Sequence, residues 1–355
     1  MADESWRTPA LVQELAAKEQ QPPARYVLPE PYHPVSAVAD LNLLESIPVI
    51  DLSQLLASDG CDDETSKLRL ALQSWGLFLV TNHGIEPNLM DDLINASREF
   101  FHQPLEEKQK CSNLIDGKHF QVEGYGNDSV KFKDQTLDWS DRLHLRVEPE
   151  DERNLARWPE HPESFRAFLH EYASNCKRIK SFILRAVART LGLNEDYFTA
   201  QFSVKAPSFA RFNHYPPCPR PDIVFGVKPH SDAGVLTILL MDKDVGGLQV
   251  LRDGVWHNVP TSPHRLLVNI GDYMEIMSNG IFKSPVHRVV TSAEKERISL
   301  AMFHGLDPEK EVEPATDLLH VEQPKRYKKV RAKEYLAGFY EHFSRGTRFI
   351  DTIKI

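Results

Sequence analysis

The sequence predicts a mixed α/β fold of the α+β type, with a helical first half and a β-rich second half. In the first half, residues 64–75, 86–101 and 162–193 carry Leu, Ala and aromatic residues at helical spacing. From Ser208 to about Phe303, short runs of β-branched and aromatic residues alternate with Pro and Gly turns. Such a succession of short strands is typical of a β-barrel or a β-sandwich.

The composition is that of an ordinary globular protein. The chain has 355 residues, 41% of them apolar and 26% charged, which allows two domains or one large β-rich domain with helical additions. A net charge of -9 argues against nucleic acid or an anionic membrane as partner, because both attract clustered Lys and Arg. The longest apolar run, Val235 to Met241, is too short to cross a bilayer. We therefore expect a small-molecule substrate.

The lack of a recognisable targeting signal and the spacing of the cysteines both favour the cytoplasm. The first residues lack the basic and then apolar pattern of a signal peptide, and they are too acidic for a typical transit peptide. Cys61, Cys111, Cys176 and Cys218 are widely spaced and form no Cys-x-x-Cys pair. Neither a zinc site nor a disulfide framework is indicated, and we expect a cytoplasmic monomer.

The N-terminal residues predict an extended arm followed by a helix-turn-strand unit. One amphipathic helix is expected near residues 11–18, whereas the proline-rich stretch 21–34 cannot hold regular structure. Residues 47–53 predict a short strand that leads into a helix. The helix over 64–75 is followed by Gly76 and by an apolar strand over 77–81.

The remaining elements follow the same signals. A helix over 86–101 stops before Pro104, and one or two longer helices over 162–193 end at Gly192. Residues 248–252 and 255–259 flank Asp253-Gly254, which predicts a hairpin. Further strands are expected over 266–270 and 297–303, and a terminal amphipathic helix over 331–345.

Five residues in the β-rich half indicate a metal site with an acid clamp. His230 and Asp232, together with His287, supply the two histidines and one carboxylate that hold non-haem Fe(II) and leave positions open. Arg297 and Ser299 add a guanidinium fork beside a hydroxyl, which is suited to binding a carboxylate.

Strand parity allows these side chains to converge, because residues two apart in a strand point the same way. An extended segment lets His230 and Asp232 bind one ion while Ser231 turns away. The same parity groups two further sets of side chains, each on one face of its strand: Arg297, Ser299, Ala301 and Phe303, and then Arg211, Asn213 and Tyr215. These faces imply a cavity lined for a partly anionic guest.

Single motifs would not carry this interpretation. A His-x-Asp pair is weak in a chain with 15 histidines, and an isolated Arg297 is more often part of a surface ion pair. His83 follows a strand in a turn and is expected to be structural, while His214 points to the face opposite Asn213 and Tyr215. The ordered combination of the pair, the later histidine and the Arg-x-Ser favours the metal site.

With these motifs the chain resembles the plant 2-oxoglutarate- and Fe(II)-dependent dioxygenases, the family of anthocyanidin synthase, flavonol synthase and codeine O-demethylase. The resemblance runs over nearly the whole chain. In the first half it rests on Ile47-Pro-Val-Ile-Asp51, on Trp75 to Gly84 and on Phe100-Phe101 to Lys108. In the second half it rests on Asn213-His-Tyr-Pro-Pro-Cys218 and on the five residues of the predicted site.

The resemblance implies a fold and a division of the chain. The fold is a double-stranded β-helix, also called a jelly-roll or cupin-like core, with an N-terminal helical module and a C-terminal helix. The expected parts are an arm over 1–46, the helical dioxygenase module over 47–200, the jelly-roll core over 201–310 and a C-terminal helical tail over 311–355.

The resemblance also implies cofactors and roles. His230, Asp232 and His287 would bind Fe(II), and Arg297 and Ser299 would hold the distal carboxylate of 2-oxoglutarate. Tyr215 and Asn213 would assist them. Dioxygen would be the second cosubstrate, and ascorbate a supporting reductant. The outcomes open to such an enzyme are hydroxylation, O-demethylation and desaturation.

A flat aromatic substrate is indicated by resemblance to particular branches. Phe303 matches a family position that stacks on flavonoid rings, but Gly305 and Arg211 replace a glutamate and a lysine of anthocyanidin synthase. Gly124-Tyr-Gly126 and Leu137 to Asp141 are closer to the codeine demethylase and senescence-related branch, which acts on alkaloids, phenylpropanoids and indoles such as melatonin. The expected pocket residues are Phe303, Arg211, Tyr125, Phe132, Val122 and Leu143.

Two other functions stay open from the sequence. One is an ascorbate-dependent oxidase like aminocyclopropane-carboxylate oxidase, which has the same iron triad and a similar Arg-x-Ser. The other is a catalytically silent barrel that only binds a small ligand.

Overall fold

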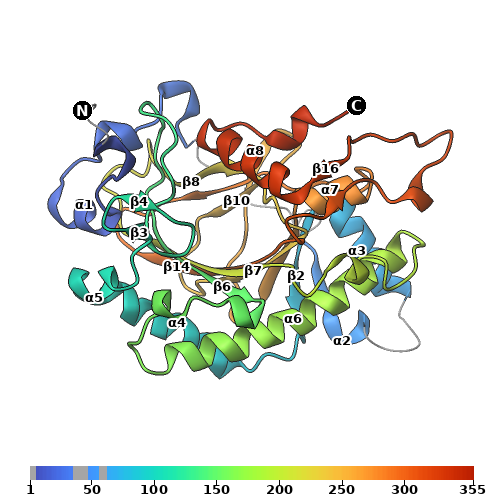
Figure 1. The fold of residues 1–355 in the computed structure, drawn as a ribbon, viewed down its shortest axis with the longest axis horizontal. Coiled ribbons are helices and arrows are strands. Elements are labelled where there is room, and N and C mark those ends of the chain that lie inside the picture. The colour runs from blue at the N-terminus through green and yellow to red at the C-terminus, as the bar shows by residue number, and fades with distance from the viewer. Residues whose placement is uncertain (1–4, 35–46, 56–61) are drawn as a thin grey trace.

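The computed structural model describes residues 5–34, 47–55 and 62–355, and it has two facing β-sheets flanked by helices (Figure 1). Residues 1–4 and 35–46 of the predicted arm, and Cys61, lie outside the described residues. The predicted α+β class and its jelly-roll core are confirmed.

The larger sheet has eight strands and draws on both halves of the chain. Its pairs are antiparallel except for the parallel pair at one edge, Val49–Asp51 beside Leu77–Thr81. In spatial order the strands are β1 (Val49–Asp51), β2 (Leu77–Thr81), β12 (Leu266–Ile270), β9 (Leu236–Met241), β14 (Arg297–His304), β7 (Ser208–Tyr215), β6 (Asp141–Glu148) and β5 (Gly124–Gly126).

The smaller sheet has four antiparallel strands. Their order is β11 (Val255–Asn258), β10 (Leu248–Arg252), β13 (His287–Val290) and β8 (Phe225–His230). The predicted hairpin joins β10 to β11, and its turn residues Asp253 and Gly254 have φ of 50° and 79°. Both values are positive, as the type I′ turn of an Asp-Gly hairpin requires.

Helices from the first half cover the outer face of the large sheet (Figure 1). The two longest are α4 (Pro87–His102) and α6 (Phe165–Thr190), and they share one apolar core with the large sheet. Pro87 suits the first turn of α4, where its missing N–H has no partner to lose. The other helices of this half are α1 (Val12–Lys18), α2 (Leu52–Leu55), α3 (Asp62–Ser74) and α5 (Leu105–Gln109).

The C-terminal helix α8 (Ala332–Ser344) lies beside the short helix α7 (Asp272–Met277), as Figure 1 shows. Tyrosine hydroxyls join the two helices: Tyr335 donates to Asp272 Oδ2 at 2.7 Å, and Tyr273 donates to the carbonyl of Ala332 at 2.8 Å. Two small sheets complete the regular structure of the described residues, β3 (Leu114–Ile115) with β4 (His119–Phe120) and β15 (Glu311–Val312) with β16 (Val330–Arg331).

The predicted elements agree with the structure, but several elements were not predicted, among them the short α5, α7, β3 and β4. Each helix and strand named from the sequence is present, with ends shifted by a few residues. The proline-rich stretch 21–34 contains only two single-turn 3-10 helices. The prediction missed β5 and β6, which lie in the half expected to be helical and extend the large sheet.

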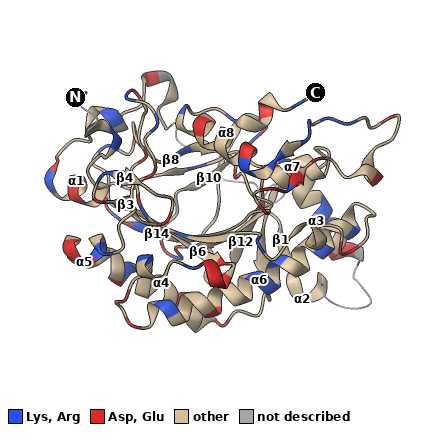
Figure 2. Cartoon of the chain, in the orientation of Figure 1, with Lys and Arg blue, Asp and Glu red and all other residues tan. Residues whose placement is uncertain are grey.

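Charges of both signs are spread over the outer helices and loops (Figure 2). In the part of the chain that the structure describes, no helix is both long enough and apolar enough to span a bilayer.

A tight contact at Gly271 leads to a stability prediction. A Cβ at this position would overlap the carbonyl oxygen of Gly234 and lie 2.9 Å from that of Asp232. The Asp232 carbonyl also accepts the N–H of Asp272 at 2.7 Å, so the loop that carries Asp232 would have to move. We expect Gly271→Ala to destabilise the protein by about 1–3 kcal/mol, measured by urea unfolding. The control is Gly246→Ala, whose Cβ would meet nothing within 4 Å, and equal losses in both variants would contradict the prediction.

Candidate active site

Two histidines and one carboxylate converge between the sheets. His230 ends β8 and His287 begins β13, and the two residues face each other as a register pair of the small sheet. Asp232 follows two residues after His230, just beyond the strand. Its Oδ1 lies 3.7 Å from the Nε2 atoms of both histidines. Ligand atoms bound to one ion at about 2.1 Å lie ~3 to 3.5 Å apart, so a small movement would close this set around a metal.

Hydrogen bonds aim the free ligand atoms at one point. The Nδ1 atoms of His230 and His287 lie 2.8 Å and 3.1 Å from the backbone carbonyls of Lys228 and Pro285. Because a carbonyl only accepts, each Nδ1 carries a proton, and in the neutral form of each ring the lone pair is then on Nε2. Asp232 Oδ2 accepts hydrogen bonds from Thr237 and Asn269 at 2.6 Å and 2.8 Å, which leaves Oδ1 free.

Protonation also suits metal binding. Burial and the neighbouring His287 lower the pKa of His230, so its imidazole is neutral near pH 7. Burial opposes ionisation of Asp232, but the two histidines outweigh it and hold the pKa of its carboxyl below its usual value. Neutral imidazole and ionised carboxylate are the forms that ligate metal.

A buried arginine faces the same interior from the large sheet. In the register of β14 with β7, Arg297 pairs with Tyr215 and Ser299 with Asn213, so all four side chains share one face, as strand parity predicted. Arg297 Nη1 donates to Ser299 Oγ at 3.3 Å, and its guanidinium lies 5.3 Å from the centre of the Tyr215 ring.

Arg297 has spare binding capacity. It is 4% exposed, its Nε has no hydrogen-bond partner, and within the described ranges no acidic side chain forms an ion pair with it. Burial lowers the pKa of this guanidinium. A buried cation without a direct ion-pair partner is costly, so the site fits an anionic ligand.

Comparison with known proteins identifies the family. A model of the 2OG-Fe(II) oxygenase superfamily matches residues 207–306, and a model of the non-haem dioxygenase N-terminal region in morphine synthesis matches residues 47–161. The chain is 37% identical to Protein SRG1 of Arabidopsis thaliana over 317 residues, which cover 89% of this chain and 87% of the relative. The chain belongs to the 2OG-Fe(II) oxygenase superfamily.

Other relatives include enzymes named for aromatic substrates. Oxoglutarate-dependent flavonoid 7-O-demethylase 1 of Ocimum basilicum is 36% identical over 97% of this chain and 90% of its own length. Codeine O-demethylase of Papaver somniferum is 35% identical over 88% of this chain and 86% of its own length. Among solved structures, JOX2 in complex with 2OG, Fe and JA has a TM-score of 0.84 and 35% identity, and the match covers 94% of each chain.

Oxygenases of this superfamily use Fe(II), 2-oxoglutarate and O2, and the described residues fit the first two. A donor set of two imidazoles and one carboxylate fits the facial triad that holds iron in non-haem Fe(II) oxygenases. The Arg297 guanidinium, with its unpartnered Nε, suits the far carboxylate of a dicarboxylic keto acid.

The residues expected to line the substrate pocket do not all lie together in the structure. Phe303 and Arg211 lie on the inner face with Arg297 and Asn213. Tyr125 and Leu143 belong to the apolar core between the large sheet and the helices, where Tyr125 packs on Phe100. Two others lie nearer the surface: Val122 is exposed, and the ring of Phe132 lies 4.0 Å from the guanidinium carbon of Arg345.

Sequence reasoning missed a set of inner-face residues on β6. Arg142 pairs with Asn213 and His144 with Arg211, so both face the interior. His144 stacks on Phe209 with ring centres 4.8 Å apart and lies 6.5 Å from Phe303. The signal was present, because residues 141–148 alternate strictly between polar and apolar types after Asp141.

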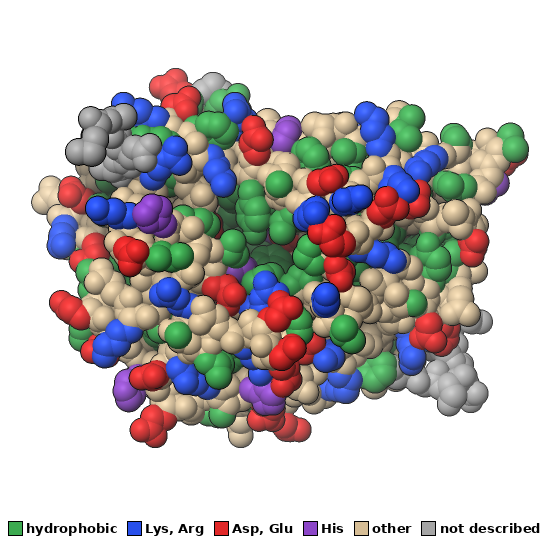
Figure 3. All heavy atoms as spheres, viewed as in Figure 1, with side chains coloured by type: hydrophobic (Ala, Val, Ile, Leu, Met, Phe, Trp, Pro, Cys, Tyr) green, Lys and Arg blue, Asp and Glu red, His purple; other side chains and the backbone are tan. Residues whose placement is uncertain are grey.

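These aromatic side chains give the interior a surface for a flat ring. Hydrophobic side chains line a hollow near the centre of the face shown in Figure 3, between α8 and the β3–β4 hairpin. At the edge of the site, Phe343 of α8 meets the His230 ring edge-on with centres 5.4 Å apart.

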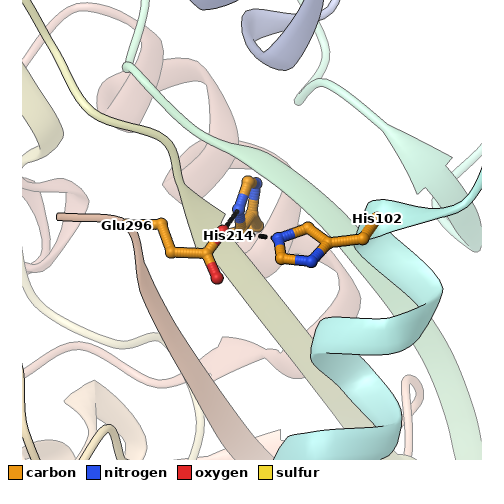
Figure 4. Close-up of side chains that lie close together, drawn as sticks. All are labelled: His102, His214 and Glu296. Atoms are coloured by element: carbon orange, nitrogen blue, oxygen red, sulfur yellow. Dashed lines mark hydrogen bonds and ion pairs between the residues drawn. The ribbon is translucent and has the colours of Figure 1, made fainter.

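A second cluster of possible metal ligands lies outside the barrel interior. Figure 4 shows the Glu296 carboxylate, just before β14, facing the rings of His214 on β7 and His102 on α4. The Nε2 atoms of these histidines lie 2.8 Å and 2.9 Å from Glu296 Oε2. His214 thus faces away from Asn213 and Tyr215, as parity predicted.

This second cluster does not meet the criteria that the first one meets. Arg98 Nε lies 3.3 Å from Glu296 Oε1 and already supplies a positive charge. The Nδ1 of His214 is buried without a hydrogen-bond partner, whereas a metal-binding histidine normally donates from its second nitrogen. We assign the cluster to ion pairing between α4 and the large sheet.

Glu296 should therefore stabilise the fold in a pH-dependent way. Burial opposes its ionisation, but hydrogen bonds from His214 and His102 lower the pKa of Glu296 to about 2. Its unfolded pKa is about 4.3. The stabilisation is thus complete above about pH 4.3 and is lost as the pH falls towards 2. We expect Glu296→Gln to cost ~1–2 kcal/mol at pH 7, a value discounted for partial exposure.

Urea unfolding at pH 7 and pH 3 measures this effect, and the difference between wild type and Glu296→Gln should shrink at pH 3. The control is Glu195→Gln, which removes a more exposed partner of Arg189 and should have little effect at either pH. A difference that is the same at both values would contradict the assignment.

Proposed function

We propose that His230, Asp232 and His287 bind Fe(II) in this oxygenase. The observation that supports this most directly is the convergence of three free ligand atoms, with both imidazoles fixed by backbone carbonyls. When bound, Fe(II) with O2 supplies the oxidative decarboxylation of 2-oxoglutarate to succinate and CO2 and the oxidising power for the substrate.

In this proposal Arg297 and Ser299 bind the distal carboxylate of 2-oxoglutarate, assisted by Tyr215 and Asn213. The register of β14 with β7 supports a common face for all four. The contribution of these residues is to hold the keto acid in one orientation and to replace water around its negative charge. Ascorbate is proposed only as a reductant that keeps the iron ferrous.

The proposed substrate is a small aromatic metabolite, such as an indole, a flavonoid or an alkaloid, that is hydroxylated, O-demethylated or desaturated. The names of the flavonoid and codeine demethylases support this class. The cluster of His144, Phe209 and Phe303 supports it independently, because offset and edge-on ring contacts recognise flat aromatic molecules. A monomeric, cytoplasmic enzyme stays a prediction from the sequence.

The test is substrate-dependent release of succinate from 2-oxoglutarate by the iron-loaded protein. A panel of indoles, flavonoids and alkaloids is screened at the same time for a mass gain of one oxygen or the loss of a methylene. Turnover with ascorbate but without 2-oxoglutarate would indicate the oxidase alternative. No succinate above the metal-free control with any member would favour the silent barrel and refute the proposal.

A further inference from the structure

Two aspartates from one segment pair with the cations of the cavity wall. The segment between β5 and β6 carries Asp128 and Asp138. Asp128 forms a two-pronged ion pair with Arg211, with Nη1–Oδ1 at 2.8 Å and Nη2–Oδ2 at 2.7 Å. Asp138 accepts from Lys228 Nζ at 2.6 Å and from the Lys228 backbone N–H at 2.9 Å.

Both cations face the barrel interior. Arg211 shares the inner face of β7 with Asn213 and Tyr215, and it lies between Asn213 and the aromatic Phe209 along the strand. Lys228 has the parity of His230 on β8, and its Nζ lies 4.7 Å from the centre of the Phe343 ring. Without the aspartates, both side chains would be available to a carboxylate on the substrate.

The hydrogen-bonding capacity of Arg211 is largely used. Beyond the two bonds to Asp128, its Nε donates to Asn213 Oδ1 at 2.7 Å. Burial opposes ionisation of Asp128, but the Arg211 guanidinium outweighs it and holds the pKa of this carboxyl well below its usual range. Asp128 therefore stays ionised and occupies the place that a substrate carboxylate would need.

The neighbouring Arg142 cannot replace Arg211 as an anion partner. Its side chain is 3% exposed, and its Nε donates to Asp128 Oδ1 at 3.1 Å. Its Nη1 donates to the carbonyls of Val122 and Gly124 at 2.8 Å and 3.0 Å. This guanidinium is committed to holding the segment against β6.

We propose that Asp128 is a specificity-determining residue, which by pairing with Arg211 makes this enzyme select neutral aromatic substrates over substrates with a carboxylate. The inference rests on the proposed function, because it concerns the substrate side of the same cavity. An acidic substrate would have to displace Asp128 and leave it unpaired beside its own negative charge, whereas a neutral ring can use the surface of Phe209 and Phe303.

Matched acids and esters test the proposal. 4-Methoxycinnamate and benzoate are each compared with their methyl esters by calorimetric titration into the Fe(II)- and 2-oxoglutarate-loaded enzyme without O2. We expect wild type to bind the esters at least tenfold more tightly than the acids. Asp128→Asn should raise acid affinity at least tenfold, leave ester affinity within about threefold, and lose this gain when Arg211→Met is added.

A second readout does not depend on ligand choice. Phenylglyoxal modifies accessible guanidinium groups, and peptide mass spectrometry reports the rate at Arg211. We expect Arg211 to react at least tenfold faster in Asp128→Asn than in wild type, with Arg185 at the surface as the internal reference. Equal rates, or wild-type enzyme that binds the acids as tightly as the esters, would overturn the proposal.

Separate controls distinguish a folding defect of the variant from a failure of the proposed function. If Asp128→Asn does not fold, Asp128→Asn/Arg211→Gln keeps the shapes without the charges. In that variant phenylglyoxal cannot report on residue 211, so the acid-to-ester ratio decides. A ratio equal to that of wild type supports the proposal, because neither protein then offers an unpaired cation at position 211. A changed ratio counts against it. Failure of the proposed function would appear as absent succinate release, which neither readout requires.

Discussion

Replacing Asp232 by alanine is expected to abolish both metal binding and turnover. The variant removes the only negative charge from the proposed iron ligands, and it also removes the acceptor for Thr237 and Asn269, which donate to Asp232 Oδ2. Two neutral imidazoles bind a divalent ion far more weakly than the complete set. We expect metal content to fall from about one equivalent per chain to near zero, and succinate formation to fall by at least ~10³-fold.

Metal analysis after dialysis, together with single-turnover succinate assays, measures both effects. The matched control is His102→Ala in the second cluster, which should leave metal content and turnover unchanged because that cluster is assigned to ion pairing. If metal stays bound to Asp232→Ala and is lost from His102→Ala, the iron site is the second cluster, and the proposed ligand assignment is wrong.

Replacing Arg297 by alanine is expected to raise the requirement for 2-oxoglutarate while the enzyme still binds iron. The guanidinium is buried and has no acidic partner among the described residues, so its charge is available to the cosubstrate. Loss of a charge-assisted, desolvated contact costs about 3 kcal/mol, which corresponds to a rise of ~10²-fold in the KM for 2-oxoglutarate. Ser299→Ala should cost less, about fivefold, because a single neutral hydrogen bond is lost.

Initial rates at varied 2-oxoglutarate concentration, with metal content measured in parallel, test this prediction. Arg252→Ala is the control, since that arginine lies at the end of β10 and stacks on Trp75 with its guanidinium carbon 4.4 Å from the ring centre. An unchanged KM for 2-oxoglutarate in Arg297→Ala would refute the proposal that Arg297 binds the cosubstrate.

Local periodicity predicted the inner face of β14 and β7 well. Arg297, Ser299, Asn213 and Tyr215 are brought together because two regular strands pair without a register shift. Parity was less strictly applicable to Asp232, which lies beyond the end of β8. Its carboxylate is held instead by Thr237 and Asn269, residues of two other strands that no local pattern connects to it.

The substrate side of the cavity was harder to predict, since it depends on contacts between distant segments. The ion pair of Asp128 with Arg211 joins residues 83 positions apart, and nothing in either local sequence specifies it. Tyr125 is adjacent to the active-site segment in sequence, yet its hydroxyl donates to Gln13 of α1 and its ring packs in the helical core. The face of a short strand such as β5 cannot be inferred before its partner is known.

The two histidines belong to the small sheet, whereas Arg297 and Ser299 belong to the large one. A keto acid that binds to both must bridge the gap between two packed layers, which is about 10 Å in such folds. The distance between the two sheets then determines how long a keto acid must be to contact both sets of residues. Oxaloacetate would then be one methylene too short and 2-oxoadipate one methylene too long, and a misplacement of about 1 Å at a reacting centre can cost ~10²-fold in rate. Selectivity for a five-carbon cosubstrate would thus be a property of the sheet packing itself, set by core residues that never touch the ligand.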